Sequence, residues 1–263
     1  MNTLNKTVTF KGVGLHSGRE VHMTVRPTQH DGITFHLNSE DIIVSKDAIG
    51  LNHMRATSLT NGSIQVQTPE HFLAACYALS LTNIHVTLDH PEVPILDGSA
   101  IEFIHQLKPN MVAIESTSQS EMEIKDDAYF TCNGSHYYAC PSDQLKITAV
   151  ISYPNHWVKS MSYTYTHSLD QFMMDIAPAR TYGFSHELDE LNEKGLAKGG
   201  SLDNVLVVGG DDYLNPPRFT DELVRHKILD FIGDMAIGGK KLRGQFVIIR
   251  PSHQGNCEFL KQL

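Results

Sequence analysis

The stretch VRHKILDFIGD, residues 224–234, has apolar residues at the three- and four-residue spacing of a helix that buries one face. It also carries His226, Asp230 and Asp234 at successive four-residue steps, and side chains at that spacing lie above one another on a helix. One interpretation of this row is a solvent-exposed face whose charged groups form caps or salt bridges. The other is a metal site in which some of these side chains bind the ion and another supports them. The surrounding sequence helps to choose between the two.

A second helix of this kind is predicted in the first half of the chain, at TPEHFLAACYALS, residues 68–80. Thr68 is a residue type favoured at helix N-caps, and Pro69 suits the first helical position. The apolar stripe that would face the core consists of Phe72, Leu73, Cys76, Tyr77 and Leu79. Each half of the chain therefore has one principal core helix.

Strands dominate the chain up to about residue 67. In REVHMTVRP, residues 19–27, Val21, Met23 and Val25 alternate with polar residues, which is typical of a half-buried strand. TVTFKGVG before it predicts another strand. HMRATSLTNGSIQVQT, residues 53–68, predicts two strands joined at Asn61-Gly62, a dipeptide typical of tight hairpins. The segments predicted after the first principal helix are a strand at 84–89 and a short helix at about 99–107.

The second half repeats the order of the first: strands with an Asn-Gly hairpin, a principal helix, a turn, a strand and a last helix. After the hairpin at Asn133-Gly134, the predicted segments are strands at 144–154 and 160–166, helices at 168–174 and 185–194, a strand at 205–209, the helix quoted above, a turn at 238–244, a strand at 245–250 and a helix from Ser252. This repetition predicts an α+β fold with two domains of similar topology, each a β-sheet layer packed on helices, and an active site at their interface. The polar stretch from Lys108 to Ser120 lacks helical periodicity, so the expected domains are 1–115 and 121–263.

Composition restricts the possible functions. The 263 residues include 41% apolar residues, which suffices for a large core, and no apolar run is long enough to span a membrane. The net charge of -9 argues against a nucleic-acid partner. The start of the sequence lacks the features of a secretory signal, so a cytoplasmic protein without integral membrane association is expected.

The four cysteines contain no CxxC pair, which argues against a thiolate zinc cluster or a redox dithiol. Cys132 and Cys140 could approach each other across a hairpin. In a cytoplasmic chain, however, the reduced state is expected.

The two principal helices carry the groups with the clearest chemistry. Glu70 and His71 lie in the first turn of one helix, where the helix dipole disfavours a charged imidazole and keeps His71 able to donate a lone pair. If the helices meet at the domain interface, His71 joins His226 and Asp230 in a site with three protein ligands, which leaves one zinc position open for chemistry. Glu70 would then be able to accept a proton from water.

Two alternatives compete with this metal site. The same residues would also serve as a satisfied polar network in the core. A zinc protease is excluded because HExxH is absent: Leu188, Asp189 and Glu190 follow His186-Glu187. The inverted motif HxxEH fails as well, because position 67 is Gln.

Several stretches in chain order resemble the UDP-3-O-acyl-N-acetylglucosamine deacetylases of lipid A biosynthesis, which are zinc-dependent amide hydrolases with two α+β domains around an interdomain active site. The stretches are KGVGLHSG (11–18), TPEHFLAACYALSLTNIHVTLDHPEVPILDGSA (68–100), ARTYGF (179–184), GLAKGGSLDN (195–204) and VRHKILDFIGD (224–234). The resemblance runs from about residue 4 to the C-terminus.

This resemblance implies a role for each candidate residue. His71, His226 and Asp230 would bind Zn2+, with Glu70 as general base and His253 as a protonated general acid. Thr181 would donate to the oxyanion, Lys227 would add positive charge near it, and Asp234 would orient His253. Without the resemblance, Thr181 would be interpreted as a helix cap, Lys227 as a solvated side chain and His253 as an ordinary residue at the start of a helix.

The implied substrate joins a diphosphate to a long acyl chain, so basic groups and an apolar passage are both expected. GLAKGGSLDN lies where the family builds part of that passage. Three residues depart from the family pattern: Lys198, where an apolar residue is usual, Tyr182, where Phe is common, and Glu258, where Lys is common. A monomer is expected. A deacetylase of another N-acetyl sugar, or a non-catalytic metal-binding relative, stays open as an alternative.

Overall fold

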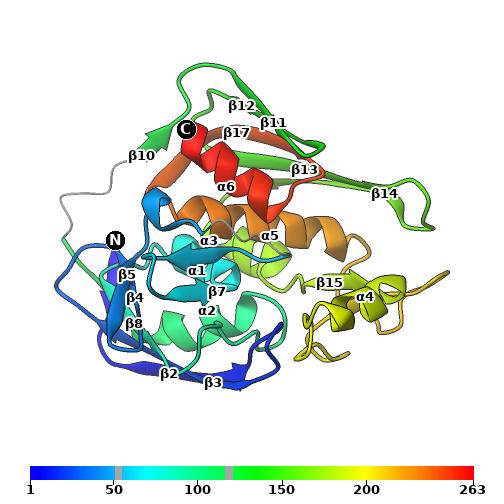
Figure 1. Ribbon diagram of the computed structural model, residues 1–263. Coiled ribbons are helices and arrows are strands. Elements are labelled where there is room, and N and C mark those ends of the chain that lie inside the picture. The colour runs from blue at the N-terminus through cyan, green and yellow to red at the C-terminus, as the bar shows by residue number, and fades with distance from the viewer. Residues whose placement is uncertain (51–54, 116–120) are drawn as a thin grey trace.

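The computed structural model describes residues 1–50, 55–115 and 121–263. Figure 1 shows β-sheets as the outer layers of the molecule, with the longest helices between them. These helices are α1 (Glu70–Ala78), α2 (Ile101–Leu107), α5 (Glu222–Ala236) and α6 (His253–Gln262). The predicted α+β class, with sheets layered on helices, is confirmed.

The sheet of the first half has five strands in the spatial order β2-β3-β8-β4-β5. Neighbouring strands are antiparallel except β4 and β8, which are parallel. The strands are β2 (Val8–Val13), β3 (Glu20–Pro27), β4 (Ile33–Leu37), β5 (Glu40–Ile43) and β8 (Ile84–Leu88). Strand β8 comes last of these five strands along the chain, after α1, and it lies in the middle of the sheet.

The sheet of the second half has the same design, in the spatial order β11-β12-β17-β13-β14. Here too the last strand, β17, lies in the middle, follows a principal helix and forms the one parallel pair of the five, with β13. The strands are β11 (Ala128–Cys132), β12 (Ser135–Cys140), β13 (Leu145–Tyr153), β14 (Lys159–Thr166) and β17 (Lys241–Ile249), and β10 (Glu121–Glu123) pairs with the start of β17. The predicted similarity in topology between the two halves is confirmed.

Local sequence explains these strands. Val21, Met23 and Val25 of β3 are fully buried and their polar neighbours are not, as the alternation predicts. The hairpin at Asn133-Gly134 joins β11 to β12, with both residues at the positive φ that a type I′ turn requires. The hairpin at Asn61-Gly62 joins β6 (Ser58–Thr60) to β7 (Gln65–Gln67). The start of the segment predicted before it, residues 53–54, lies outside the described residues.

Helices α1 and α5 pack against each other between the two sheets. All nine residues of α1 are buried, so this helix is a core element on every side. Gly233 of α5 is the point of closest approach, because a Cβ atom at this position would lie 2.0 Å from the carbonyl oxygen of Glu70. The absence of a side chain at Gly233 therefore permits the contact between the halves.

Two predictions at element boundaries are wrong. Thr68 does not cap α1: its φ of +55° places it in a left-handed turn before the helix, and its hydroxyl points to Glu92 at 3.3 Å. Residues 238–244 are not all turn, because β17 begins at Lys241. Leu242 is buried and continues the alternation of the strand, although the charged residues and glycines around it resemble a turn. The helix predicted from Ser252 is confirmed, since the Ser252 hydroxyl caps α6 by accepting from the Gly255 amide.

Each half also contains an insertion before its principal helix. In the first half this is the short β6–β7 hairpin. In the second half it is much longer and contains α3 (Leu169–Gln171), a π-helical turn (Phe172–Ile176), β15 (Tyr182–Phe184), α4 (Leu188–Glu193) and β16 (Leu206–Val208). Figure 1 shows β15 and α4 at one end of the helical layers. The helices predicted near 168–174 and 185–194 are confirmed.

Short strands lie on both sides of residues 116–120, which fall outside the described residues. β9 (Met111–Ala113) pairs with β1 (Asn2–Leu4) of the first half, whereas β10 pairs with β17 of the second half. The polar stretch from Lys108, where the domain boundary is expected, thus begins with a 3-10 turn (Lys108–Asn110) and strand β9.

All four cysteines are free. The suggestion that Cys132 and Cys140 could approach each other across a hairpin is wrong. Cys132 is opposite Ser135 beside the turn, and Cys140 ends the other strand opposite Gln245. In the described ranges, no helix combines the length and apolar character that crossing a membrane requires.

Candidate active site

Helix α1 presents Glu70 and His71 from its first turn. The left-handed turn at Thr68 redirects the chain from β7 into the helix, so that two consecutive polar residues enter the buried space between the halves. Glu70 is 2% exposed and His71 4% exposed. Polar groups buried to this degree require partners, and these come from the other half.

Helix α5 presents His226, Asp230 and Asp234 from one buried face, so the row lies in the interior and not on a solvent face. The Nδ1 atom of His226 lies 3.0 Å from the carbonyl oxygen of Ala179 and donates its proton to it. In the neutral ring, Nε2 then carries a lone pair, and this atom lies 3.1 Å from Oδ1 of Asp230. Two lone pairs that face each other in this way call for a cation between them.

His71, His226 and Asp230 converge as the sequence predicts. One ligand atom from each lies within 4.8 Å of the others, and the two imidazole rings are 5.0 Å apart, edge to face. Within the described residues, His71 Nδ1, Asp230 Oδ1 and Glu70 Oε2 are buried without a hydrogen-bond partner. Two imidazoles and a carboxylate with unpaired atoms suit a divalent ion such as Zn2+, so the residues present fit this metal.

The His71 side chain is held in its neutral form. Burial lowers its pKa, and this effect outweighs that of the nearby Asp230 carboxylate, which raises it. The direction agrees with the expectation from the sequence, but the main cause is burial and not the helix dipole. A neutral imidazole is the form that donates a lone pair to a metal.

Glu70 and His253 face each other beside this cluster, with His253 Nε2 3.8 Å from Glu70 Oε1. Burial raises the pKa of Glu70 to about 8, because a buried carboxylate loses its hydration. Burial opposes the charged form of His253 as well, but the carboxylates of Asp234, Asp230 and Glu70 outweigh it and raise the pKa of His253 to about 9. The pair thus consists of an acid and a base that both titrate above neutral pH when no ion is bound.

Asp234 fixes the orientation of His253. Its Oδ2 atom lies 3.0 Å from His253 Nδ1 and also accepts a hydrogen bond of 2.8 Å from the Asn256 side chain. The Thr57 hydroxyl donates to the other carboxylate oxygen, at 2.5 Å. Thr57 and Asn256 were not among the predicted residues. For Asn256, one signal was available: it follows His253 by three residues in the same helix, so both lie on one face.

Lys227 and Thr181 border the same space. The Lys227 side chain is 20% exposed and its Nζ atom lies 2.7 Å from Oδ2 of Asp230, so it is not a freely solvated lysine. Thr181 does not cap a helix: it lies in extended chain before β15, bonded through its backbone to Gly98 and Leu206. Both residues line the cavity next to the cluster, so all eight predicted site residues except Asp234, which lies behind His253, line one cavity.

That cavity has a volume of about 500 Å3 and is polar. Arg55, Asn133, Arg250 and Gln254 lie on its walls, along with the residues discussed above. A cavity of this size with convergent polar groups is the usual form of a small-molecule site.

An adjoining cavity of about 300 Å3 is mainly apolar and shares Leu15, Arg55, Thr181 and Tyr182 with the polar cavity. Its other walls include Leu188, Leu191, Leu202, Val205 and Val207. Ala197 and Gly200 of the stretch GLAKGGSLDN contribute to it, which agrees with the expected position of an apolar passage.

Comparison with known proteins identifies the family. The family model described as UDP-3-O-acyl N-acetylglycosamine deacetylase matches residues 1–263. This chain belongs to that family. It is 38% identical to the UDP-3-O-acyl-N-acetylglucosamine deacetylase of Oleidesulfovibrio alaskensis, over 99% of this chain and 88% of the relative. It is 35% identical to the enzyme of that name from Syntrophotalea carbinolica, over 100% of this chain and 87% of the relative.

The three departures from the deacetylase family pattern lie at different distances from the site. Tyr182 lines both cavities, and its hydroxyl bonds that of Tyr153 at 2.7 Å. Lys198 is exposed and is not among the residues that line the apolar cavity. Glu258 pairs with Lys261 at 2.8 Å and does not line the polar cavity. Of these three residues, only Tyr182 therefore lines the described cavities.

Proposed function

We propose that this chain is a zinc-dependent hydrolase that removes the N-acetyl group of UDP-3-O-acyl-N-acetylglucosamine and releases acetate, at an early committed step of lipid A biosynthesis. The observation that carries the proposal is the convergence of His71, His226 and Asp230 from two helices, with Glu70 and His253 beside them. The family name of the relatives supplies the substrate, and the geometry supplies a role for each residue.

In this proposal His71, His226 and Asp230 hold the ion, and three protein ligands leave one position of a tetrahedral zinc site open. When bound, zinc supplies a Lewis acid that polarises the acetamide carbonyl and makes water more acidic. The ion would also satisfy the unpaired buried Oδ1 atom of Asp230. It lowers the cost of burying Asp230 beside Glu70 and Asp234.

Glu70 acts as the general base. Its Oε2 atom is buried and makes no hydrogen bond to any of the described residues, so a lone pair is available to accept a proton from the attacking water. A nearby cation favours the carboxylate form, which lowers the pKa of Glu70 from the value of about 8 that burial gives it in the metal-free chain.

His253 acts as the general acid. Because Nδ1 donates to Asp234, the second proton of the imidazolium is on Nε2, which faces Glu70 and the cavity. The surrounding carboxylates raise the pKa of His253, so the ring is protonated at neutral pH and able to donate to the departing amine. Asp234 orients the ring and does not itself transfer the proton.

Lys227 and Thr181 stabilise the oxyanion in this proposal. Attack on the carbonyl carbon places negative charge on one oxygen, and an ammonium and a hydroxyl on the cavity wall offer donors to it. In the present arrangement Lys227 is bound to Asp230, whose negative charge partly offsets its own. Coordination of an ion by Asp230 would weaken that contact and leave Lys227 freer to face substrate.

The two cavities suit the two ends of the substrate. The apolar cavity behind Thr181 and Tyr182 accommodates the acyl chain, and the polar cavity, with Arg250 and Arg55 on its walls, accommodates the sugar and the UDP group. Arg55 is bound to Glu187 at 2.8 Å, which leaves Arg250 as the more available contact for a phosphate.

We also propose that residues 1–115 and 121–263 form two domains with the active site between them, and that the protein is a cytoplasmic monomer. The pairing of β9 with β1 and of β10 with β17 supports this division, because the short strands next to residues 116–120 belong to opposite halves.

The proposal is tested by assaying acetate release from the UDP-linked 3-O-acyl substrate before chelation, after chelation and after return of zinc. Activity should be lost with the metal and recovered with it. Glu70→Gln should lower kcat by about 10²- to 10⁴-fold while zinc content stays near one per chain. Glu102→Gln is the control and should leave both unchanged, because Glu102 is a half-buried glutamate at the start of α2 and does not line the cavity.

Other outcomes separate the remaining possibilities. Zinc binding with no acetate release from any acyl length, but with release from another N-acetyl sugar, would favour a deacetylase of different specificity. Zinc binding without release from any N-acetyl sugar would favour a non-catalytic relative.

A further inference from the structure

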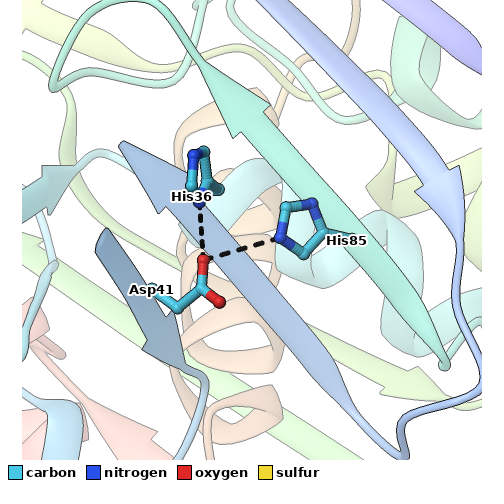
Figure 2. A group of neighbouring side chains, drawn as sticks. All are labelled: His36, Asp41 and His85. Carbon is cyan, nitrogen blue, oxygen red and sulfur yellow. Dashed lines mark hydrogen bonds and ion pairs between the residues drawn. The ribbon is translucent and has the colours of Figure 1, made fainter. Parts of the chain in front are cut away.

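A second group of metal-binding side chains lies on the outer face of the first sheet, on the side away from α1. Figure 2 shows His36 of β4, Asp41 of β5 and His85 of β8 pointing toward one another above three adjacent strands. Neighbouring residues Phe35, Ile42 and Val86 are buried on the core side. The three polar side chains therefore project together from the solvent face.

Strand register explains why these residues meet. His36 is directly opposite Asp41 in the antiparallel pair of β4 and β5. His85 is opposite Thr34 in the parallel pair of β4 and β8, two residues from His36 and hence on the same face. Diagonal neighbours of this kind are within reach of long side chains such as histidine.

The distances are close to those of a metal site. Asp41 Oδ1 lies 2.7 Å from His36 Nδ1 and 3.5 Å from His85 Nε2, and the two rings are 5.4 Å apart. One ligand atom from each residue lies within 4.8 Å of the others. Ligands about 2.0–2.2 Å from a tetrahedral ion are about 3.3–3.6 Å apart, so the pair of His85 and Asp41 already has this spacing and His36 and Asp41 would need to separate slightly.

We propose that His36, Asp41 and His85 form a second, surface-exposed binding site for a divalent transition metal ion of the zinc, nickel and copper class. Two imidazoles favour these ions over magnesium and calcium, which prefer oxygen ligands. Solvent reaches the group, with side-chain exposures of 33% for His36, 32% for His85 and 56% for Asp41, so water can complete the coordination.

Charge at the site supports this assignment. Asp41 is an exposed carboxylate that both His36 and His85 face, so it offers negative charge to a cation. The chain as a whole carries a net charge of -9, which also favours binding of a cation.

A neighbouring cluster shows what a simple hydrogen-bonded pair looks like on the same sheet. His22 of β3 lies 2.8 Å from Asp89 and 3.7 Å from Glu20, and it has no second imidazole in this group. One imidazole with two carboxylates is a weaker site for zinc-class ions than two imidazoles with one. His22 is therefore a matched control.

An ion at the proposed site would connect three strands. β5 is an edge strand and pairs with β4 alone in this sheet. Coordination by Asp41 would attach this edge to β4 and to the central strand β8. Binding should therefore raise the thermal stability of the chain, because the ion binds the folded arrangement only.

The test uses the protein with the buried cluster already loaded with zinc. Ni2+ is added by equilibrium dialysis, and bound nickel and zinc are both counted by mass spectrometry. The expected result is one nickel per chain with zinc retained, together with a rise in Tm. His36→Gln and His85→Gln should each weaken nickel binding by at least about tenfold, since changing even an outer partner of a metal ligand costs 10- to 100-fold. His22→Gln should bind nickel as the unchanged chain does.

Three results would overturn the proposal: no nickel uptake beyond displacement of zinc, equal uptake by the His36→Gln and His85→Gln chains, or equal loss in the His22→Gln chain. All three positions are exposed or half-buried, so folding should be preserved, and circular dichroism checks this. Deacetylase activity should not change in any of the three, which separates this site from the buried cluster and from the function proposed above.

Discussion

The two halves of the molecule have the same sheet topology but contribute to the site in different ways. Helix α1 contributes Glu70 and His71 from its first turn and is otherwise filled with apolar contacts. Helix α5 contributes residues along two turns of one face, from His226 to Asp234, and α6 adds His253 behind it. The same fold, used twice, therefore yields a base and one ligand from one half, and most of the charged groups from the other.

The insertions follow the same division. The short β6–β7 hairpin of the first half lies between β5 and α1, whereas the long insertion of the second half carries Thr181 and Tyr182 and forms most of the apolar cavity. A repeated topology thus provides the framework, and the segments added to it provide the differences in chemistry.

The largest expected effect comes from removing the carboxylate that α5 contributes to the metal cluster. Asp230→Asn should weaken zinc binding by more than about 100-fold, because Asp230 is a direct ligand in the proposed site and loss of an outer partner alone costs 10- to 100-fold. Activity should fall to background in parallel. Zinc content after dialysis is the measurement, and Asp221→Asn at the start of the same helix is the control. Full zinc retention by Asp230→Asn would contradict the assignment.

The next effect concerns the pH dependence of kcat/KM. Glu70 must be ionised and His253 protonated, so the profile should be a bell that falls at low pH with Glu70 and at high pH with His253. His253→Gln should lower kcat by about 100-fold and remove the high-pH limb. Asp234→Asn should move that limb to lower pH, because it removes a carboxylate that raises the pKa of His253. An unshifted limb in Asp234→Asn would refute the role of Asp234.

A smaller effect tests the contact between α1 and α5. In an exposed helix, changing glycine to alanine stabilises by about 1 kcal/mol. Gly233→Ala should instead destabilise by about 1–3 kcal/mol, because its Cβ would meet the Glu70 carbonyl at 2.0 Å and force the helices apart. The measurement is urea unfolding, with Gly210→Ala, which meets no atom within 4 Å, as the control. A gain in stability would show that the helices can separate freely.

The smallest effect concerns Lys198, in the long insertion of the second half. Because this side chain is exposed and does not line the apolar cavity, Lys198→Leu should change kcat/KM by less than about twofold. Acetate release from substrates with different acyl lengths is the measurement. A changed preference for acyl length would show that Lys198 reaches the chain-binding passage after all.

Much of this fold could be predicted from the sequence because its signals are local. Alternation in β3 and the Asn133-Gly134 turn each depend on a few adjacent residues, and both are confirmed. The boundaries that went wrong depend on distant partners. Thr68 has a good capping side chain, but its hydroxyl donates to Glu92 and its backbone amide donates to the Thr57 carbonyl. Strand β17 begins at Lys241 because β10 pairs with it there.

The site shows the same distinction. The residues of the helix motifs could be singled out because spacing puts them on one face and the family resemblance assigns them roles. Thr57 reaches Asp234 across 177 positions of the chain, and no local pattern signals such a contact. The group at His36, Asp41 and His85 depends on β8 entering the sheet beside β4, a long-range pairing that periodicity does not reveal.

The close approach at Gly233 determines how this enzyme can vary in sequence without losing its geometry. Where two side chains meet, a larger residue on one side can be offset by a smaller one on the other. Here the facing group is a main-chain carbonyl of Glu70, which no substitution can shorten. No substitution elsewhere can therefore compensate for a side chain at position 233. The residues around it in the core can change, but glycine must stay at this position.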